Sequence, residues 1–325
     1  MPPASPPPIA LTSLKIRDFR GIDDLELDFR GPDGLPNHLV VLAGPNGSGK
    51  TAVLEAALIA VGGHKLVVGR RGKRAIRGGA EDYEIRAQAR MLDEDSTLVG
   101  SSRVPPPGTD PRLPYWYFSS WRAPNPVGAV NPTVGKPGRR PAKTGPNRLL
   151  NVKQQLVNAA TRQNFPGAKQ SLFREYSRWI ARINAGWKKF HPDHDDEFSV
   201  GLVEKEEVNG GVLEVFYQRE GSPPRSVDDL SSGQLELFLF LAALVLNDDR
   251  EGIVFIDEPE LHLDPQWHAP VVRALMQLQP KAQFIVATHS PEIYDAASSY
   301  ERHFLVPEDD PRARAWPGIG AGVEA

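Results

Sequence analysis

The chain has 325 residues, of which 40% are hydrophobic and 24% are charged, so it can form one large domain or two small ones with a full core. It contains no cysteine, which excludes disulfides and cysteine-based metal or redox sites, and its formal net charge is −3. The longest apolar run, residues 235–246, is too short for a membrane span and carries Glu236. The Pro-rich residues 1–10 lack the basic region of a signal peptide, so we expect a disordered tail and a cytoplasmic protein.

The first predicted elements are strands. Apolar side chains alternate within residues 11–29 on both sides of Gly21, which predicts two short strands joined by a turn. Residues 61–80 are rich in Gly and Arg and predict a loop or hairpin. The alternating residues 83–92 and the aromatic residues 115–118 predict two further strands.

A phosphate-binding loop is predicted between two of these regions. Residues 44–51 fit the pattern G-x-x-x-x-G-K-[ST], follow the apolar run 39–43 and lead into a helix-forming segment. Glycines let backbone N–H groups point at a polyphosphate, Lys50 would neutralise its charge, and the Thr51 hydroxyl would ligate Mg²⁺. The pattern predicts a nucleoside triphosphate site formed by Gly44, Asn46, Gly47, Ser48, Gly49, Lys50 and Thr51.

Basic residues are strongly segregated along the chain. Residues 136–189 hold 13 Lys or Arg and one acid, Glu175, so this segment carries +12 and the rest of the chain −15. A second run, residues 65–77, has six cations and no acid. Such segregation favours a polyanionic partner for one surface, either DNA or RNA, and we expect duplex DNA.

Two helices are predicted within the basic segment, after residues 128–146, whose Pro and Gly content predicts a mobile stretch. On the second helix the arginines lie opposite the apolar stripe, as in a solvated helix face or a nucleic-acid contact. The candidate nucleic-acid residues are Arg139, Arg140, Arg174, Arg178 and Arg182.

The next motif opens a buried helix. Residues 198–217 predict a hairpin, and residues 230–246 predict an apolar helix that begins with Leu-Ser-Ser-Gly-Gln. Ser231 is a good N-cap residue, and its hydroxyl together with exposed N–H groups could also form a second anion site. The sequence thus offers one phosphate site at the phosphate loop and another at the start of this helix. Two such sites suggest a nucleotide bound between two subunits.

Two further motifs follow buried strands. Residues 253–256 are apolar and end in Asp257 and Glu258, a Walker B pattern in which Asp257 would support Mg²⁺ and Glu258 would polarise the attacking water. His289 follows the strand at 284–287, where it could donate a hydrogen bond to the γ-phosphate. Strands alternating with helices after a phosphate loop predict a three-layer α/β core.

The order of these motifs resembles the ABC-type ATPases, an AAA-family group. The motifs follow one another in the order found in that family: the phosphate loop, the L-S-S-G-Q signature, the I-D-E-P of Walker B, L-D-P at residues 263–265, and T-H-S. The opening residues 14–22 and the run 257–263 are similar to the soluble branch that contains RecF, the chromosome-maintenance proteins and the OLD ATPases. The resemblance implies an ABC-type ATPase head with an antiparallel β subdomain, and a role in phage defence or DNA repair.

The resemblance also implies roles for single residues. Glu258 would be the hydrolytic base, His289 the switch, and Asp264 the aspartate of the D-loop, with Lys50 and the rest of the phosphate loop holding ATP. Ser231 and Gly233 of one subunit would touch the γ-phosphate bound by the other, giving a homodimer around ATP and Mg²⁺. The family's Q-loop glutamine has no clear counterpart in this sequence. Gln88 is one candidate, and the segment 119–122 lies in the expected region of the chain but contains no glutamine.

The predicted organisation has five parts: a disordered tail at 1–10, an ATPase lobe at 11–125, a basic and partly flexible helical insertion at 126–195, the remaining motifs at 196–306 and a disordered tail at 307–325. No long heptad run occurs. The nuclease domain of OLD proteins is missing, so we expect a separately encoded effector. The leading interpretation is an ATP-hydrolysing, DNA-engaging dimer; the alternatives are a slow ATP-dependent switch that restrains a toxin or nuclease, and a transporter ATPase subunit.

Overall fold

The computed structural model describes residues 5–71, 76–78, 80–92, 94–101, 113–120, 127–132, 148–163, 170–203, 212–247 and 251–306. At its centre is a parallel sheet formed by β3 (Leu39–Ala43), β6 (Tyr115–Phe118), β10 (Gly252–Asp257), β11 (Ala282–Thr288) and β12 (Arg302–Phe304). The five strands have the order β12-β3-β11-β10-β6, and every neighbouring pair is parallel. Their carboxyl ends therefore lie at one edge, where ligands bind in sheets of this kind.

Both faces of the parallel sheet are buried. In β10, Ile253 and Phe255 join one hydrophobic cluster and Val254 and Ile256 join the other, as the twofold alternation of a strand requires. A strand covered on both faces is apolar throughout, and residues 253–256 were predicted as a strand for this reason.

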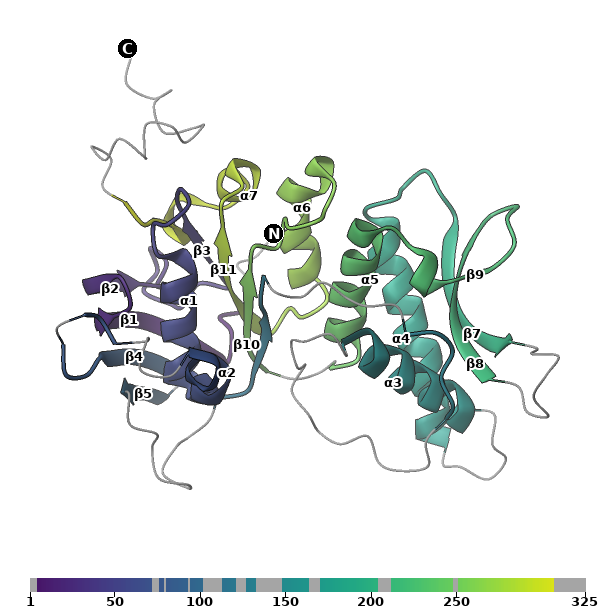
Figure 1. Ribbon diagram of the computed structural model, residues 1–325, viewed down its shortest axis with the longest axis horizontal. Helices are drawn as coiled ribbons and strands as arrows, with labels where there is room; N and C mark the ends of the chain where they lie inside the picture. The colour runs from purple at the N-terminus through teal and green to yellow at the C-terminus, as the bar shows by residue number, and fades with distance from the viewer. Residues whose placement is uncertain are drawn as a thin grey trace, which may run out of the picture.

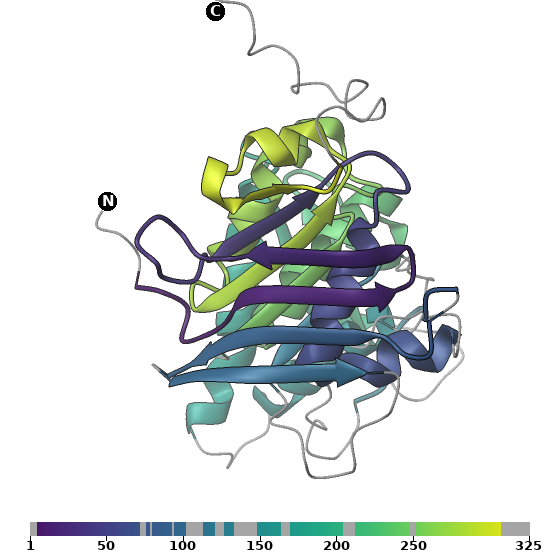
Figure 2. The ribbon, with the colours of Figure 1, turned by 90° about the vertical axis from the view of Figure 1, so that its left-hand side faces the viewer.

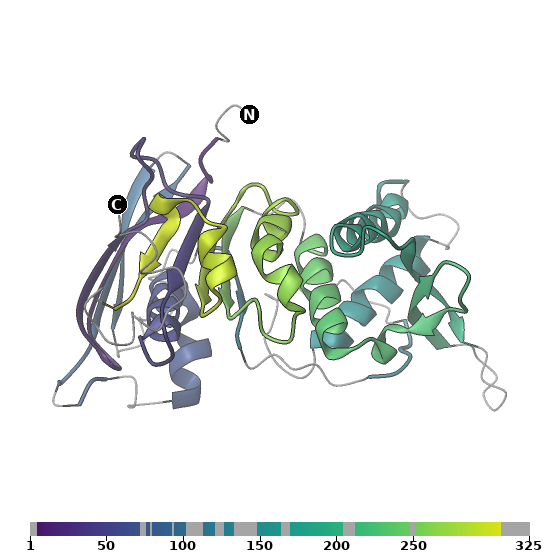
Figure 3. The same cartoon turned by 90° about the horizontal axis from the view of Figure 1, so that it is seen from above.

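An antiparallel sheet forms a second layer. It contains β1 (Ile9–Phe19), β2 (Ile22–Asp28), β4 (Glu84–Met91) and β5 (Glu94–Ser101), in the order β2-β1-β4-β5. Helix α1 (Lys50–Leu58) lies between this sheet and the parallel sheet (Figures 2 and 3), and Leu54 packs in one cluster with Ile16 and Val40. The predicted three-layer α/β core with an antiparallel β subdomain is confirmed.

Helices cover the other face of the parallel sheet (Figure 1). Nearest to the sheet are α5 (Ser232–Val245), α6 (His268–Met276) and the short α7 (Pro291–Asp295). Beyond α5 lie α3 (Arg148–Gln163), α4 (Gln170–Lys188) and a small antiparallel sheet of β7 (Asp196–Val203), β8 (Val212–Arg219) and β9 (Arg225–Ser226). Helix α5 is buried on nearly all sides, and its cluster extends from the parallel sheet to α3 and α4. The two helices predicted in the basic segment are therefore part of the main core.

Two sequence predictions need correction. Strand β1 begins at Ile9, so residues 9 and 10, which we assigned to the tail, belong to the sheet. The segment 61–80, predicted as a loop or hairpin, is helical as far as Arg71: α1 continues through a π turn (Ile59–Gly63) into α2 (His64–Arg71). This turn packs against β5 so closely that a Cβ at Gly100 would lie 2.8 Å from the Ile59 side chain. Gly62, with a φ of +98°, kinks the chain between α1 and α2, a conformation that glycine adopts readily.

Most other predicted elements are confirmed, including the strands within 11–29, 83–92 and 115–118, the hairpin of β7 and β8, and the helix at 230–246. Residues 133–146 of the predicted mobile stretch, and both tails apart from residues 5–10, lie outside the described residues. Val130 is buried and pairs with Leu213 of β8, so the start of that stretch is anchored. In the described part of the chain, no helix has the length and apolar character that a membrane span needs.

Candidate active site

The phosphate loop joins β3 to α1 at the carboxyl edge of the parallel sheet. Its three glycines, Gly44, Gly47 and Gly49, all have a positive φ, so none could be replaced without strain. Gly49, the residue before α1, has a φ of +95°, and a Cβ at Gly44, where φ is +148°, would lie 2.8 Å from the Ser48 hydroxyl. The loop thus adopts the curled backbone that the sequence pattern predicted.

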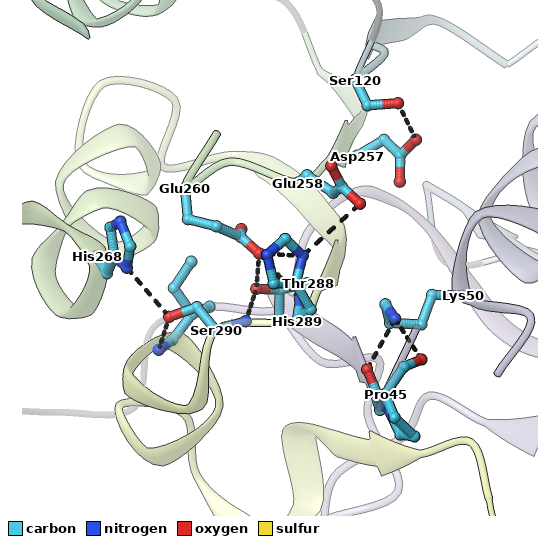
Figure 4. A network of polar contacts seen from close by, with 12 residues as sticks. Pro45, Lys50, Ser120, Asp257, Glu258, Glu260, His268, Thr288, His289 and Ser290 are labelled. Atoms are coloured by element: carbon cyan, nitrogen blue, oxygen red, sulfur yellow. Dashed lines mark hydrogen bonds and ion pairs between the residues drawn. The ribbon is translucent and has the colours of Figure 1, made fainter. Parts of the chain in front are cut away.

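Lys50 is buried within this loop. Its ammonium group donates to the carbonyl oxygens of Gly44 at 2.7 Å and Pro45 at 2.9 Å (Figure 4). Burial lowers the pKa of Lys50, and the negative charges of three nearby carboxylates oppose that shift. The Lys50 ammonium group therefore lies at the same sheet edge as Asp257, the last residue of β10, and the two glutamates that follow it, Glu258 and Glu260.

Asp257, the last residue of β10, is 1% exposed and accepts two hydrogen bonds. The Thr51 hydroxyl donates to Oδ1 at 3.0 Å, and the Ser120 hydroxyl donates to Oδ2 at 3.0 Å. Hydroxyl and carboxylate oxygens are the ligand types that Mg²⁺ prefers, so Thr51 and Asp257 fit the metal role proposed for them.

Ser120 follows β6, the strand next to β10, and lies in the Q-loop candidate segment 119–122. The other candidate, Gln88, is exposed on β4 and accepts a hydrogen bond from Thr97 of β5. The structure therefore places Ser120 at the site. The signal for it in the sequence was its position after a parallel strand.

Glu258 has a backbone conformation that redirects its side chain. Its φ is +54°, in the left-handed region that costs a non-glycine residue about 1 kcal/mol or more, and its N–H donates to the Ala287 carbonyl at 2.7 Å. Strain of this kind persists where the surroundings hold the residue, and here it turns the carboxylate toward His289.

His289, directly after β11, stands between two carboxylates (Figure 4). Its Nδ1 is 3.6 Å from Glu258 Oε1 and 3.3 Å from Glu260 Oε1. The hydrogen bond to Glu258 raises the pKa of His289 most, burial opposes it, and the charges of Glu260 and Glu258 add to the rise. The imidazole is therefore biased toward its protonated form, in which both ring nitrogens donate.

The signature motif lies elsewhere in the chain. Ser231 caps α5: its Oγ accepts from the Gln234 N–H at 3.3 Å, and Gln234 Oε1 accepts from the Ser231 N–H at 3.2 Å. A Cβ at Gly233 would lie 2.3 Å from the carbonyl oxygen of His262, so only glycine allows this close approach to the turn after β10. Asp264 is exposed and caps the 3₁₀ turn Pro265–Trp267.

The predicted residues thus fall into two groups. Lys50, Thr51, Asp257, Glu258 and His289 meet at the carboxyl edge of the parallel sheet. Helix α5, with Ser231 and Gly233 at its start, lies on the opposite side of β10 and β11 from α1 (Figures 1 and 3). A single chain therefore separates its phosphate loop from its signature motif.

Three cations of the basic segment pair with acidic side chains of the same chain, and two of these pairs are buried. Arg148 pairs with Glu236, Lys153 with Glu214 and Asp228, and Arg162 with Glu175. Charge counting cannot reveal such pairs because the acids lie mostly outside the segment.

The nucleic-acid candidates have different surroundings. Arg178 is exposed on α4, whereas Arg182 donates to the Leu278 carbonyl at 2.6 Å and so ties α4 to the end of α6. Arg139, Arg140 and the side chain of Arg174 lie outside the described residues.

Comparison with known proteins gives the same assignment as the motifs. A family model described as "AAA domain, putative AbiEii toxin, Type IV TA system" matches residues 90–295, and one described as "AAA domain" matches residues 13–98. The DNA replication and repair protein RecF of Shigella boydii is 24% identical over 360 residues, which cover 92% of this chain and 98% of that protein.

The Septu protein PtuA of Bacillus mycoides is 23% identical over 303 residues, covering 86% of this chain, and that of Bacillus thuringiensis is 41% identical over 78 residues, covering 23%. The matches span only 38% and 20% of these two relatives. Among solved structures, an SMC head bound to the C-terminal winged-helix domain of ScpA superimposes with a TM-score of 0.56 at 15% identity, covering 89% of this chain and 92% of that one.

The structural similarity shows the fold, and it agrees with the predicted ABC-type head. The first family model covers more than half of the residues. The chain therefore belongs to this AAA-domain family, and it is similar in sequence to RecF.

Proposed function

We propose that the protein hydrolyses ATP to ADP and phosphate. The observation that carries this proposal is the buried Asp257, hydrogen-bonded by Thr51 of the phosphate loop and followed by a carboxylate beside His289. These groups lie at the edge where parallel sheets bind their ligands.

In the proposed reaction, Glu258 takes a proton from water as the water oxygen attacks the γ-phosphorus, and the bond to the bridging oxygen of ADP breaks. Lys50 neutralises phosphate charge, and protonated His289 donates a hydrogen bond to the transferred group. Mg²⁺ held by Thr51 and Asp257 would supply further charge neutralisation.

We also propose that two copies complete the site around ATP. The position of α5, which begins with the signature motif and lies on the opposite side of β10 and β11 from α1, supports this arrangement. The capping of α5 leaves Ser231 exposed, as an anion contact from a second copy requires.

The wider role we propose is DNA engagement in phage defence or repair, with a separately encoded effector such as a nuclease. The names of the Septu and RecF relatives and the basic residues 136–140 support this role. A second candidate, a slow ATP-dependent switch that restrains a toxin or nuclease partner, is favoured by the internal pairing of Arg148, Lys153 and Arg162. That pairing reduces the charge available to a polyanion.

Charge reversal distinguishes these roles. Changing Arg139, Arg140 and Arg178 to Glu should weaken binding to duplex DNA similarly for all sequences, and should reduce the slope of log K against log salt by roughly 0.9 per lost phosphate contact. ATP hydrolysis that DNA stimulates in the wild type should lose that stimulation. Arg182 is left unchanged because it bonds the backbone of Leu278.

A matched control reverses Lys15 and Arg17, which pair with Glu26 and Asp24 on the antiparallel sheet. These changes should leave DNA binding and its salt slope near the wild-type values. Equal effects of the two sets, or wild-type hydrolysis that DNA leaves unchanged, would contradict DNA engagement and favour the switch.

A further inference from the structure

The turn after β10 brings a third carboxylate, that of Glu260, into the site (Figure 4). The left-handed Glu258 and its bond to Ala287 fold this turn over the end of β11. As a result the Glu260 side chain faces Thr288 and His289, the last residue of the strand and the first after it.

The contacts of Glu260 are concentrated on one oxygen. Oε1 accepts from the Thr288 hydroxyl at 2.8 Å and the His289 backbone N–H at 2.9 Å, and it lies 3.3 Å from His289 Nδ1. The side chain is only 4% exposed, and its Oε2 is buried with no hydrogen-bond partner among the described residues. A buried carboxylate needs compensating donors or a cation, and here Thr288 and His289 supply them.

His289 can serve only one carboxylate well at a time. Its Nδ1 carries one hydrogen, and Glu260 is nearer to that nitrogen than Glu258, at 3.3 Å against 3.6 Å. When Glu260 accepts this hydrogen, Nε2 remains available to a phosphate and Glu258 remains available to the attacking water.

We propose that Glu260 is a positioning residue that holds the His289 ring through Nδ1 and keeps it protonated, so that Glu258 is left to act as the base. The proposal rests on the proposed ATP hydrolysis and gives a role to Glu260, which lies within the run 257–263 but was assigned no role from the sequence. The charged groups that face His289 are Glu258 and Glu260, which favour the imidazolium, and Lys50, which disfavours it.

The test is Glu260→Gln, which keeps an acceptor oxygen for Thr288 and the His289 N–H but removes the charge. In nucleotide-free protein, NMR titration should show the pKa of His289 lowered by about one unit. Hydrolysis that needs protonated His289 is lost as pH rises through this pKa. The alkaline limb of the kcat profile should therefore move to lower pH by the same amount, about a tenfold loss of kcat on that limb.

Glu292→Gln is the matched control. Glu292 also pairs with a histidine, His268 at 3.7 Å, and accepts from the Ser290 hydroxyl at 2.6 Å, close to the same strand end. Its loss should change the pKa of His289 and the kcat profile far less than the loss of Glu260.

A folded Glu260→Gln protein with an unchanged His289 pKa would overturn the proposal. A lowered pKa with an unmoved kcat profile would overturn the role in hydrolysis. If the variant does not fold, the wild-type titration decides, since a His289 pKa at or below the ordinary value of about 6.5 contradicts the proposal. The titration needs no ATP, so a wild-type protein without ATPase activity would refute the proposed function while leaving this result intact.

Discussion

Replacing Glu258 with glutamine should slow ATP hydrolysis by about 10² to 10⁴-fold while ATP binding is retained. Glutamine has the same shape but cannot take the proton of the attacking water. The groups that hold the phosphates are unaffected, because Lys50 bonds the phosphate loop and Asp257 bonds Thr51 and Ser120. Phosphate release at saturating ATP and equilibrium binding of a fluorescent ATP analogue measure the two effects separately.

Glu84→Gln, an isosteric change of a carboxylate on β4 that pairs with Arg86, is the control and should hydrolyse ATP at the wild-type rate. Because hydrolysis would open the proposed dimer, Glu258→Gln should also accumulate a dimer in the presence of ATP, visible by size-exclusion chromatography. Near-normal turnover in this variant would show that another group acts as the base.

Arg148→Ala should lower the free energy of unfolding by about 3–5 kcal/mol. Arg148 donates to Glu236 at 3.0 Å, and the two side chains are 4% and 0% exposed. The guanidinium also lies over the rings of Phe118 and Phe240, 4.8 and 5.2 Å from their centroids. Removing it leaves a buried carboxylate without its cation and opens a space between α3, α5 and β6. Urea unfolding of the wild type and the variant measures the loss.

The matched control is the double variant Arg148→Met with Glu236→Leu, which replaces both charges with apolar side chains of similar volume. It should be much more stable than Arg148→Ala, because no charge is left buried alone. A loss below about 1 kcal/mol in the single variant would mean that the pair is solvated and does not hold α3 against α5.

The sequence predicted the core and the motifs because each has a local cause. The strand at 253–256 is covered on both faces and is therefore apolar throughout, and the phosphate loop needs glycines at fixed spacings. The cap of α5 also follows from neighbouring residues, since Ser231 and Gln234 bond each other.

The remaining features depend on contacts between distant residues. The π turn Ile59–Gly63 packs on β5, which the local sequence does not reveal. The charge of Lys153 is compensated within the protein because Glu214 and Asp228 pair with it. Ser120 lies in a Q-loop candidate segment and Glu260 in the run 257–263, but the sequence assigned neither side chain a role. Only the pairing of β6 and β11 with β10 brings them to the site. Such positions become visible when the register of the sheet is known.

Complementation between two inactive variants tests the central claim, a site shared by two copies, most directly. Lys50→Ala should inactivate the phosphate loop and leave the signature motif intact. Ser231→Arg should inactivate the signature motif and leave the phosphate loop intact, so each variant alone should hydrolyse little ATP. In an equal mixture about half of the dimers would be mixed and each would keep one intact site of two, restoring roughly a quarter of the wild-type rate. A mixture no more active than its two components measured separately would contradict the shared site.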